Sequence, residues 1–152
     1  MQRANWDGWT DWLPLVHSIP QAPATPGAYM IAARRALNRA VGRDVEGILG
    51  IGESDNLNRR LRDFLGCARG TKAAGHMAGY RYNLFGYSRV FPLESLWICW
   101  CGVGNKDEAY ALEGKMLSEY LAQHYELPPL NYKFNWSEHA AEESMAERSQ
   151  EA

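Results

Sequence analysis

The sequence predicts an α+β domain with a small, mostly antiparallel three-stranded sheet flanked by helices. Two apolar, β-branched runs at 27–35 and 44–54 are separated only by a turn-forming stretch, NRAVGRD, which is typical of a hairpin. A third buried-strand pattern, LWICWCGV at 96–103, lies between two amphipathic helical patterns. The order strand, strand, helix, strand, helix excludes a doubly wound nucleotide-binding sheet.

The two helical patterns each carry one apolar stripe. The first follows the second strand, has Asp55 as its expected cap, and repeats its stripe at Leu57, Leu61, Phe64, Leu65 and Ala68. The second begins at Asp107 and runs to about Tyr125. Between the first helix and the third strand, residues 70–92 contain four glycines. They predict a long irregular insertion around a short strand, YRYNL.

The 152 residues fit one domain, expected at 26–136, after a tryptophan-rich segment at 1–25. An acidic tail at 137–152 has five glutamates against one arginine, a pattern of a flexible, solvated segment. The start of the chain shows no signal-peptide pattern, and no apolar run is long enough to cross a membrane. Three cysteines without a CxxC pair favour a reducing, cytoplasmic location.

The middle of the chain is basic although the whole chain has a formal charge of −2. Between Arg34 and Arg89 there are 11 lysine and arginine residues against 5 aspartate and glutamate residues, an excess of six positive charges. Such an excess favours a surface that binds a polyanion. A solubilising face of the domain would have the same composition.

Glu113 stands inside the apolar stripe of the second helix, four residues after Ala109 and four before Leu117. A carboxylate on a core-facing stripe needs an arginine, a hydrogen-bond network or a metal ion to offset its loss of water. The alternative is a glutamate at the stripe's edge that reaches solvent.

Arg59, Arg60 and Arg62 follow each other closely on the first helix, and a guanidinium fits bidentate contact with phosphate. The alternative is a solvated helix face, although Arg60 is placed nearest the buried edge. Tyr29 lies early in the first strand and could simply pack there. His76 lies in the glycine-rich insertion, where a histidine either moves protons or is merely a mobile loop residue.

Five motifs occur in one order: PGAY at 26–29, GIG at 50–52, NLNRRL at 56–61, ALEGKML at 111–117 and PPLN at 128–131. Together they resemble the GIY-YIG nuclease superfamily, over roughly residues 26–131. The resemblance implies a three-stranded antiparallel sheet flanked by helices and a metal-dependent endonuclease that hydrolyses DNA phosphodiester bonds.

The glycines at 47, 50 and 52 do not form a nucleotide-binding fingerprint. Their GxxGxG spacing differs from the GxGxxG of dinucleotide-binding folds, and the P-loop lysine is missing.

The resemblance implies a role for each matching residue. Tyr29 would organise or deprotonate the attacking water, and Arg60 would hold the scissile phosphate. Glu113 would bind one divalent metal ion, Mg²⁺ or Mn²⁺. Asn131 would support the active site.

This sequence departs from the superfamily pattern at three positions. Gly50 stands where the second motif carries a tyrosine, Glu53 where some members have lysine, and Phe64 where a histidine or tyrosine is often found. Two interpretations follow. Either a group from the insertion, His76 or the tyrosines Tyr80 and Tyr82, replaces the missing tyrosine, or the chain is a catalytically impaired nucleic-acid-binding module.

DNA is the expected partner, with contacts from Arg59, Arg62, Lys72 and Arg81. A compact nuclease of restriction or repair type would read DNA through its own insertion, because no separate DNA-binding domain is visible. Cutting both strands of a duplex with one site per chain would favour a homodimer. A protein-interaction module is a third class, which the basic middle disfavours.

Overall fold

The computed structural model describes residues 7–133 and Gln150. Trp6 and nearly all of the predicted acidic tail lie outside the described residues. The main sheet is antiparallel throughout, with the strand order β1-β6-β2-β5. Its strands are β1 (Leu13–Pro14), β2 (Gly27–Ala32), β5 (Ile48–Ser54) and β6 (Trp97–Gly102). A separate hairpin joins β3 (Leu37–Asn38) to β4 (Arg43–Asp44).

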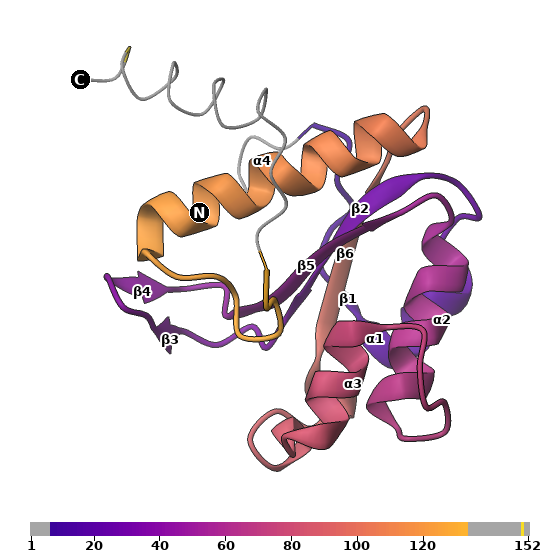
Figure 1. Cartoon of the computed structure of the whole chain (residues 1–152), viewed down its shortest axis with the longest axis horizontal. Coiled ribbons are helices and arrows are strands. Elements are labelled where there is room, and N and C mark those ends of the chain that lie inside the picture. Colours follow the sequence, from indigo (N-terminus) through magenta and orange to yellow (C-terminus); the bar gives the residue numbers. More distant parts are fainter. Residues whose placement is uncertain (1–6, 134–149, 151–152) are drawn as a thin grey trace.

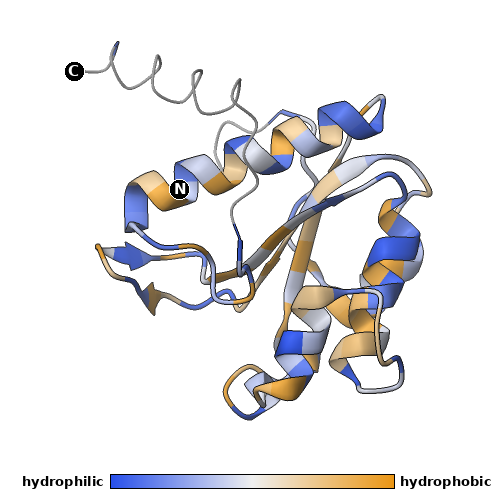
Figure 2. Ribbon diagram, viewed as in Figure 1, coloured by the Kyte–Doolittle hydropathy of each residue, from blue (hydrophilic) through white to orange (hydrophobic). Residues whose placement is uncertain are grey.

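Helices cover both faces of the sheet (Figure 1). One face carries α4 (Lys106–His124), and the other carries α2 (Leu57–Ala68) with α3 (Met77–Leu84) and the short α1 (Leu15–Ser18). Three 3₁₀ turns connect these elements: η2 (Ile19–Gln21), η3 (Tyr87–Arg89) and η4 (Leu93–Ser95). Figure 2 shows hydrophobic residues concentrated in the central strands.

The sheet separates two hydrophobic cores, and β2 is buried along its whole length. Tyr29 and Ile31 face the α2 side, whereas Met30 faces α4. A bulge interrupts the pairing of β5, because Ile31 pairs with Gly50 but Ala32 pairs with Ile48. The extra residue brings two isoleucines that are three positions apart, Ile48 and Ile51, to the same α4 face.

Asp44 fixes α4 against the sheet. Its carboxylate is buried and accepts hydrogen bonds from the backbone N–H groups of Gly47 at 3.0 Å and Ile48 at 2.7 Å, just before and at the start of β5. It also accepts a hydrogen bond from the Tyr120 hydroxyl of α4 at 3.0 Å. Because buried charges need such partners, this cluster sets where α4 lies on the sheet.

The predicted α+β class is confirmed, with three differences in detail. The sheet has a fourth strand, because the two residues of β1 pair with the edge of β6, where a proline is tolerated. The predicted strand YRYNL is wrong: residues 80–84 belong to α3, whose Gly79 and Tyr82 pack against α2. The cap of α2 is Asn56 rather than Asp55, since the Asn56 side chain accepts the Arg59 N–H at 2.9 Å.

Across residues 7–133 and Gln150, no helix is both long and apolar enough to cross a membrane.

Candidate active site

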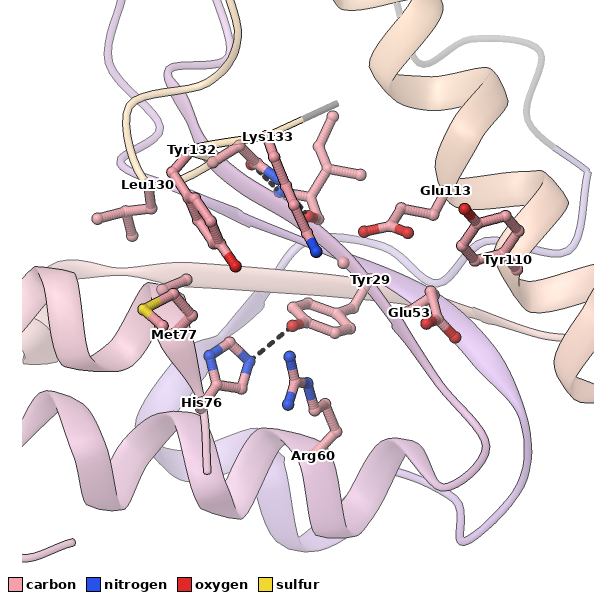
Figure 3. A pocket seen from close by; sticks show the side chains of 14 residues that line it. Tyr29, Glu53, Arg60, His76, Met77, Tyr110, Glu113, Leu130, Tyr132 and Lys133 are labelled. Atoms are coloured by element: carbon pink, nitrogen blue, oxygen red, sulfur yellow. Dashed lines mark hydrogen bonds between the residues drawn. The ribbon is translucent and has the colours of Figure 1, made fainter. Parts of the chain in front are cut away.

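A pocket of about 390 Å³ opens at the β5 edge of the sheet, between the helix layers on its two faces. Figure 3 shows its side chains converging from β2, β5, α2, α4 and the chain after α4. The predicted site residues in its lining are Tyr29, Arg60, His76, Glu113 and Asn131. The lining also includes Glu53, Met77, Tyr110, Tyr132 and Lys133.

Tyr29 lies across the backbone of the neighbouring strand. It pairs with Gly52 of β5, and its side chain is only 3% exposed. A Cβ atom on Gly52 would overlap the ring and the hydroxyl oxygen of Tyr29. The glycine that ends the GIG motif is therefore required because the tyrosine occupies the space of its side chain.

Gly52→Ala should destabilise the protein by about 1–3 kcal/mol, because the new methyl group must displace the packed ring of Tyr29. Gly50→Ala is the matched control on the same strand. A Cβ atom there meets no atom nearer than the Leu130 Cβ at 3.6 Å. Urea denaturation of both variants checks the prediction, and an equal loss of stability in the two would contradict it.

His76 holds the Tyr29 hydroxyl. It is the N-cap of α3, where its Nδ1 atom accepts the Gly79 N–H at 3.2 Å. An imidazole that accepts at Nδ1 carries its proton on Nε2, and Nε2 lies 2.7 Å from the Tyr29 hydroxyl oxygen. His76 therefore donates this hydrogen bond, and the hydroxyl proton of Tyr29 is left to point elsewhere.

The surroundings of His76 favour its neutral form. Its ring is 2% exposed and packs edge-on against Phe64, with the ring centroids 5.2 Å apart. Burial, followed by the charge of Arg60, lowers the pKa of His76 to about 3. A buried imidazole with this pKa is not suited to moving protons near neutral pH. It positions Tyr29 instead.

The acidity of Tyr29 depends on two opposing influences. Burial raises the pKa of its phenol to about 12, and the neighbouring Arg60 guanidinium opposes this rise. The carboxylates of Glu113 and Glu53 add smaller contributions that raise the pKa further. A cation or a hydrogen-bond donor placed beside the phenol oxygen would favour the ionised form.

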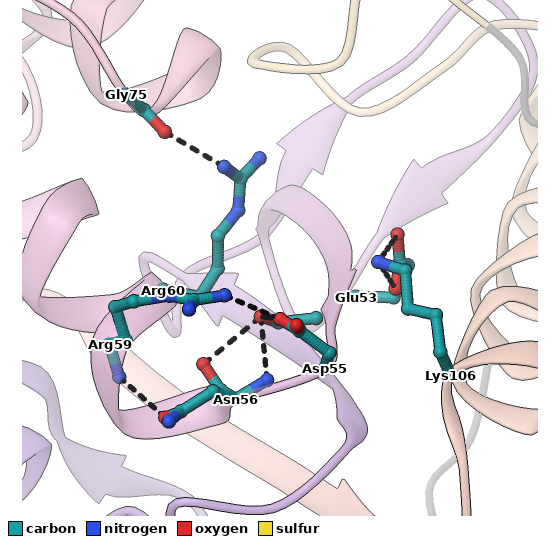
Figure 4. Close-up of polar contacts among 8 residues, drawn as sticks. Glu53, Asp55, Asn56, Arg59, Arg60, Gly75 and Lys106 are labelled. Carbon is teal, nitrogen blue, oxygen red and sulfur yellow. Dashed lines mark hydrogen bonds and ion pairs between the residues drawn. The ribbon is translucent and has the colours of Figure 1, made fainter.

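Arg60 comes from the first turn of α2 and lines the pocket, whereas its neighbour Arg59 does not. Figure 4 shows Arg60 extending to Gly75, while Arg59 turns to Asp55. One terminal nitrogen of Arg60 donates to the Gly75 carbonyl at 2.9 Å. Its Nε is buried and has no hydrogen-bond partner among the described residues. A buried donor without a partner is costly unless a ligand satisfies it, and a phosphate oxygen is a suitable acceptor.

Glu113 is half-buried on α4, and its carboxylate points into the pocket (Figure 3). It therefore lies at the edge of the apolar stripe and reaches the pocket rather than the core. Glu53 is the other carboxylate in the lining, and Lys106 contacts both of its oxygens at 2.7 and 2.5 Å. The described residues contain no group of three or more histidine, cysteine or acidic side chains that could hold a metal ion.

This donor set fits a hard divalent cation such as Mg²⁺ or Mn²⁺. Mg²⁺ keeps several of its waters and binds through one or two carboxylates together with substrate phosphates. Structural Zn²⁺ and Ca²⁺ sites need more protein ligands than this pocket offers. Glu113 is the residue that would hold the ion.

Asn131 closes the outer edge of the sheet. Its side-chain oxygen accepts the Ile51 N–H at 2.9 Å, and its amide nitrogen donates to the Ile51 carbonyl at 2.9 Å. The amide thus pairs with the free edge of β5 as a neighbouring strand would. The backbone N–H of Leu130 adds a bond to the Leu49 carbonyl at 2.7 Å. Together these bonds hold the chain from Leu130 to Lys133 along one wall of the pocket.

Three comparisons with known proteins bear on this geometry. No protein-family model matches the sequence, and no curated protein matches it. Among solved structures, the chain is similar to the N-terminal endonuclease domain of UvrC from Thermotoga maritima. That domain is of the GIY-YIG type. The magnesium-bound form is 22% identical, and two point mutants bound to the catalytic divalent cation are 21% and 23% identical. Each match covers 78% of this chain and 96% of the other, with a TM-score of 0.44.

Neither Tyr80 nor Tyr82 takes the place of the tyrosine that the superfamily resemblance implies at Gly50. A Cβ atom there would face Leu130 and the Asn131 oxygen at 3.6 and 3.9 Å. Tyr82 is buried and donates its hydroxyl to the Phe91 carbonyl at 2.6 Å, and Tyr80 does not line the pocket. The expected substitutes from the insertion are therefore wrong, apart from the contact of His76 with Tyr29.

Sequence reasoning missed Tyr110 and Tyr132, the two other tyrosines in the lining. Tyr110 precedes Glu113 by one helical turn, so its place on the same face of α4 was a signal that helical periodicity could have used. Tyr132 and Lys133 follow the last motif and reach the pocket only because Asn131 holds their segment against β5.

The basic residues predicted to contact DNA have separate local partners. Arg59 pairs with Asp55 at 2.6 Å, Arg62 donates to the Asn58 side chain at 2.8 Å, and Lys72 pairs with Asp63. Arg81 packs between aromatic rings beside the pocket mouth. Arg59 lies in a neighbouring polar hollow that it shares with Arg60 and Lys106.

Proposed function

We propose that this pocket hydrolyses phosphodiester bonds of DNA in a metal-dependent endonuclease reaction. The observation that carries the proposal is the convergence of Tyr29 from β2, Arg60 from α2 and Glu113 from α4 on one pocket. In-line attack on a phosphodiester needs a proton acceptor for water, a cation for the phosphate and a Lewis acid near the leaving oxygen. Each of the three side chains suits one of these needs.

Tyr29 receives the proton of the attacking water in this reaction. The donated hydrogen bond from His76 Nε2 orients the phenol oxygen and favours its ionised form. Arg60 supports the same ionisation and offers its unpartnered Nε to a phosphate oxygen. Arg60 donates to the carbonyl of Gly75 in the loop before α3, and His76 accepts the N–H of Gly79 in the first turn of α3.

Glu113 holds the divalent cation, for which Mg²⁺ and Mn²⁺ are the proposed ions. The bound ion supplies charge stabilisation at the phosphate and the leaving oxygen. Glu53 lies near enough to influence the Tyr29 phenol, and Lys106 neutralises it.

The test is cleavage of supercoiled plasmid and of single-stranded circular DNA, with Mg²⁺, with Mn²⁺ and with EDTA. We expect metal-dependent nicking by the wild type and a loss of about 100-fold in Glu113→Gln, because the amide is a weaker ligand for a hard cation. Excess metal should restore part of the activity of this variant.

Glu119→Gln is the matched control, since Glu119 is also a half-buried glutamate on α4 but does not line the pocket. Its activity should equal that of the wild type. An inactive wild type under every metal, with normal DNA binding, would instead favour the impaired nucleic-acid-binding module. Equal cleavage in EDTA would contradict the metal requirement.

A further inference from the structure

The surface beside the pocket mouth combines exposed aromatic rings with positive charge. From Phe64 to Leu93 the chain carries Arg69, Lys72, Arg81 and Arg89 but no aspartate or glutamate. This segment includes α3 and the turns on either side of it. Lys72 is paired with Asp63, just before this stretch, so its excess positive charge comes from the three arginines. Such an excess beside the proposed phosphate-binding pocket favours a polyanion.

The outer face of α3 is unusually apolar for an exposed helix. Its inner face packs on α2 through Gly79, where a Cβ atom would overlap the Phe64 carbonyl, and through the buried Tyr82. The opposite face presents Met77 and Leu84, about two turns apart, and the C-cap Phe85 follows them. These three side chains are 48%, 56% and 59% exposed. Exposed apolar side chains that lie together on one helix face are typical of a binding surface.

Arg81 joins this face to the pocket. Its guanidinium carbon lies 5.8 Å from the ring centroid of Phe85 and 5.7 Å from that of Tyr132. Its Nε is buried and has no hydrogen-bond partner within the described part of the chain. Lys133 lies over the Tyr132 ring at 5.8 Å, and Met77, Tyr132 and Lys133 all line the pocket. Rings and cations therefore alternate from Phe85 to the pocket mouth.

We propose that this aromatic strip, formed by Phe85, Arg81 and Tyr132, binds the unpaired bases of a single strand whose phosphate enters the pocket. Every base has a flat π face, so aromatic and guanidinium groups stack on unpaired bases without regard to sequence. In an intact duplex those faces are already stacked on each other, and only edges and phosphates are available. The substrate class is therefore nucleic acid with unpaired nucleotides beside the scissile phosphate.

This inference rests on the proposed function, but its test does not require cleavage. A fluorescent single-stranded oligonucleotide is titrated in EDTA, and its anisotropy is compared with that of the same strand annealed into a duplex. Phe85→Ala and Tyr132→Ala should each weaken single-strand binding about 5- to 150-fold and duplex binding less than about twofold. Both rings are more than half exposed, so their removal leaves the core intact.

Tyr125→Asn is the matched control. Tyr125 is a 73% exposed ring at the far end of α4, beside the β3–β4 hairpin. Its backbone is left-handed, with a φ of 55°, a conformation that asparagine tolerates. This variant should bind both oligonucleotides as the wild type does.

Several outcomes would overturn the strip as a single-strand site. One is a wild type that does not bind single strands, and another is an equal loss of duplex and single-strand binding in Phe85→Ala and Tyr132→Ala. A third is self-association of the protein that depends on these rings, in place of DNA binding. The proposed hydrolysis would survive them if duplex cleavage with metal remained. Conversely, ring-dependent single-strand binding without any cleavage would uphold the strip and contradict the hydrolysis.

Discussion

Tyr29→Phe should lower the rate of DNA cleavage about 100- to 10,000-fold, the usual contribution of a positioned proton acceptor. The variant removes only the hydroxyl group that His76 holds at 2.7 Å. The ring still fills the space beside Gly52, so the fold should be unchanged. Single-turnover cleavage with saturating enzyme isolates this step from DNA binding.

The pH dependence gives this prediction a second measurement. The pKa of Tyr29 is raised to about 12, so only a small fraction of the phenol is ionised at neutral pH. At pH values below that pKa, the ionised fraction rises about tenfold for each unit by which the pH increases. The wild-type rate should therefore rise with pH through the neutral and mildly alkaline range. A Tyr29→Phe variant that kept the same slope would show that another group accepts the proton.

Replacing Arg60 with alanine should reduce cleavage about 1,000-fold, because the guanidinium offsets the charge that develops on the phosphate in the transition state. Arg60→Lys should recover little of this loss. A lysine keeps the charge, but it cannot bond the Gly75 carbonyl and a phosphate oxygen at once through a rigid planar group.

Arg59→Ala is the matched control for Arg60, since it removes the adjacent arginine of the same helix. Arg59 is paired with Asp55, and its side chain is 61% exposed. We expect a small change in DNA affinity and no change in the cleavage rate at saturation. Equal effects at the two positions would mean that the arginines act as a general basic surface. A salt titration of binding would show this as similar slopes for both variants.

Much of the fold could be predicted from local pattern. The runs at 27–35 and 96–103 contain β2 and β6, and the stripes on α2 and α4 appear where helical periodicity put them. These elements bury apolar side chains at fixed intervals, so each one leaves its period in the sequence. The segment around α3 leaves no such period, because glycine, tyrosine and arginine alternate there and a single glycine provides the close contact with α2.

The sequence determined which side chains are suited to phosphodiester chemistry and the order in which they occur, since motif spacing is a property of the chain alone. Only the tertiary structure decided their states. His76 is a neutral donor rather than a base because α3 occupies its Nδ1 and the core removes water from its ring. Tyr132 and Lys133 belong to the pocket because Asn131 binds the open edge of β5. Desolvation and long-range pairing depend on residues far apart in the chain, so neither appears in any local pattern.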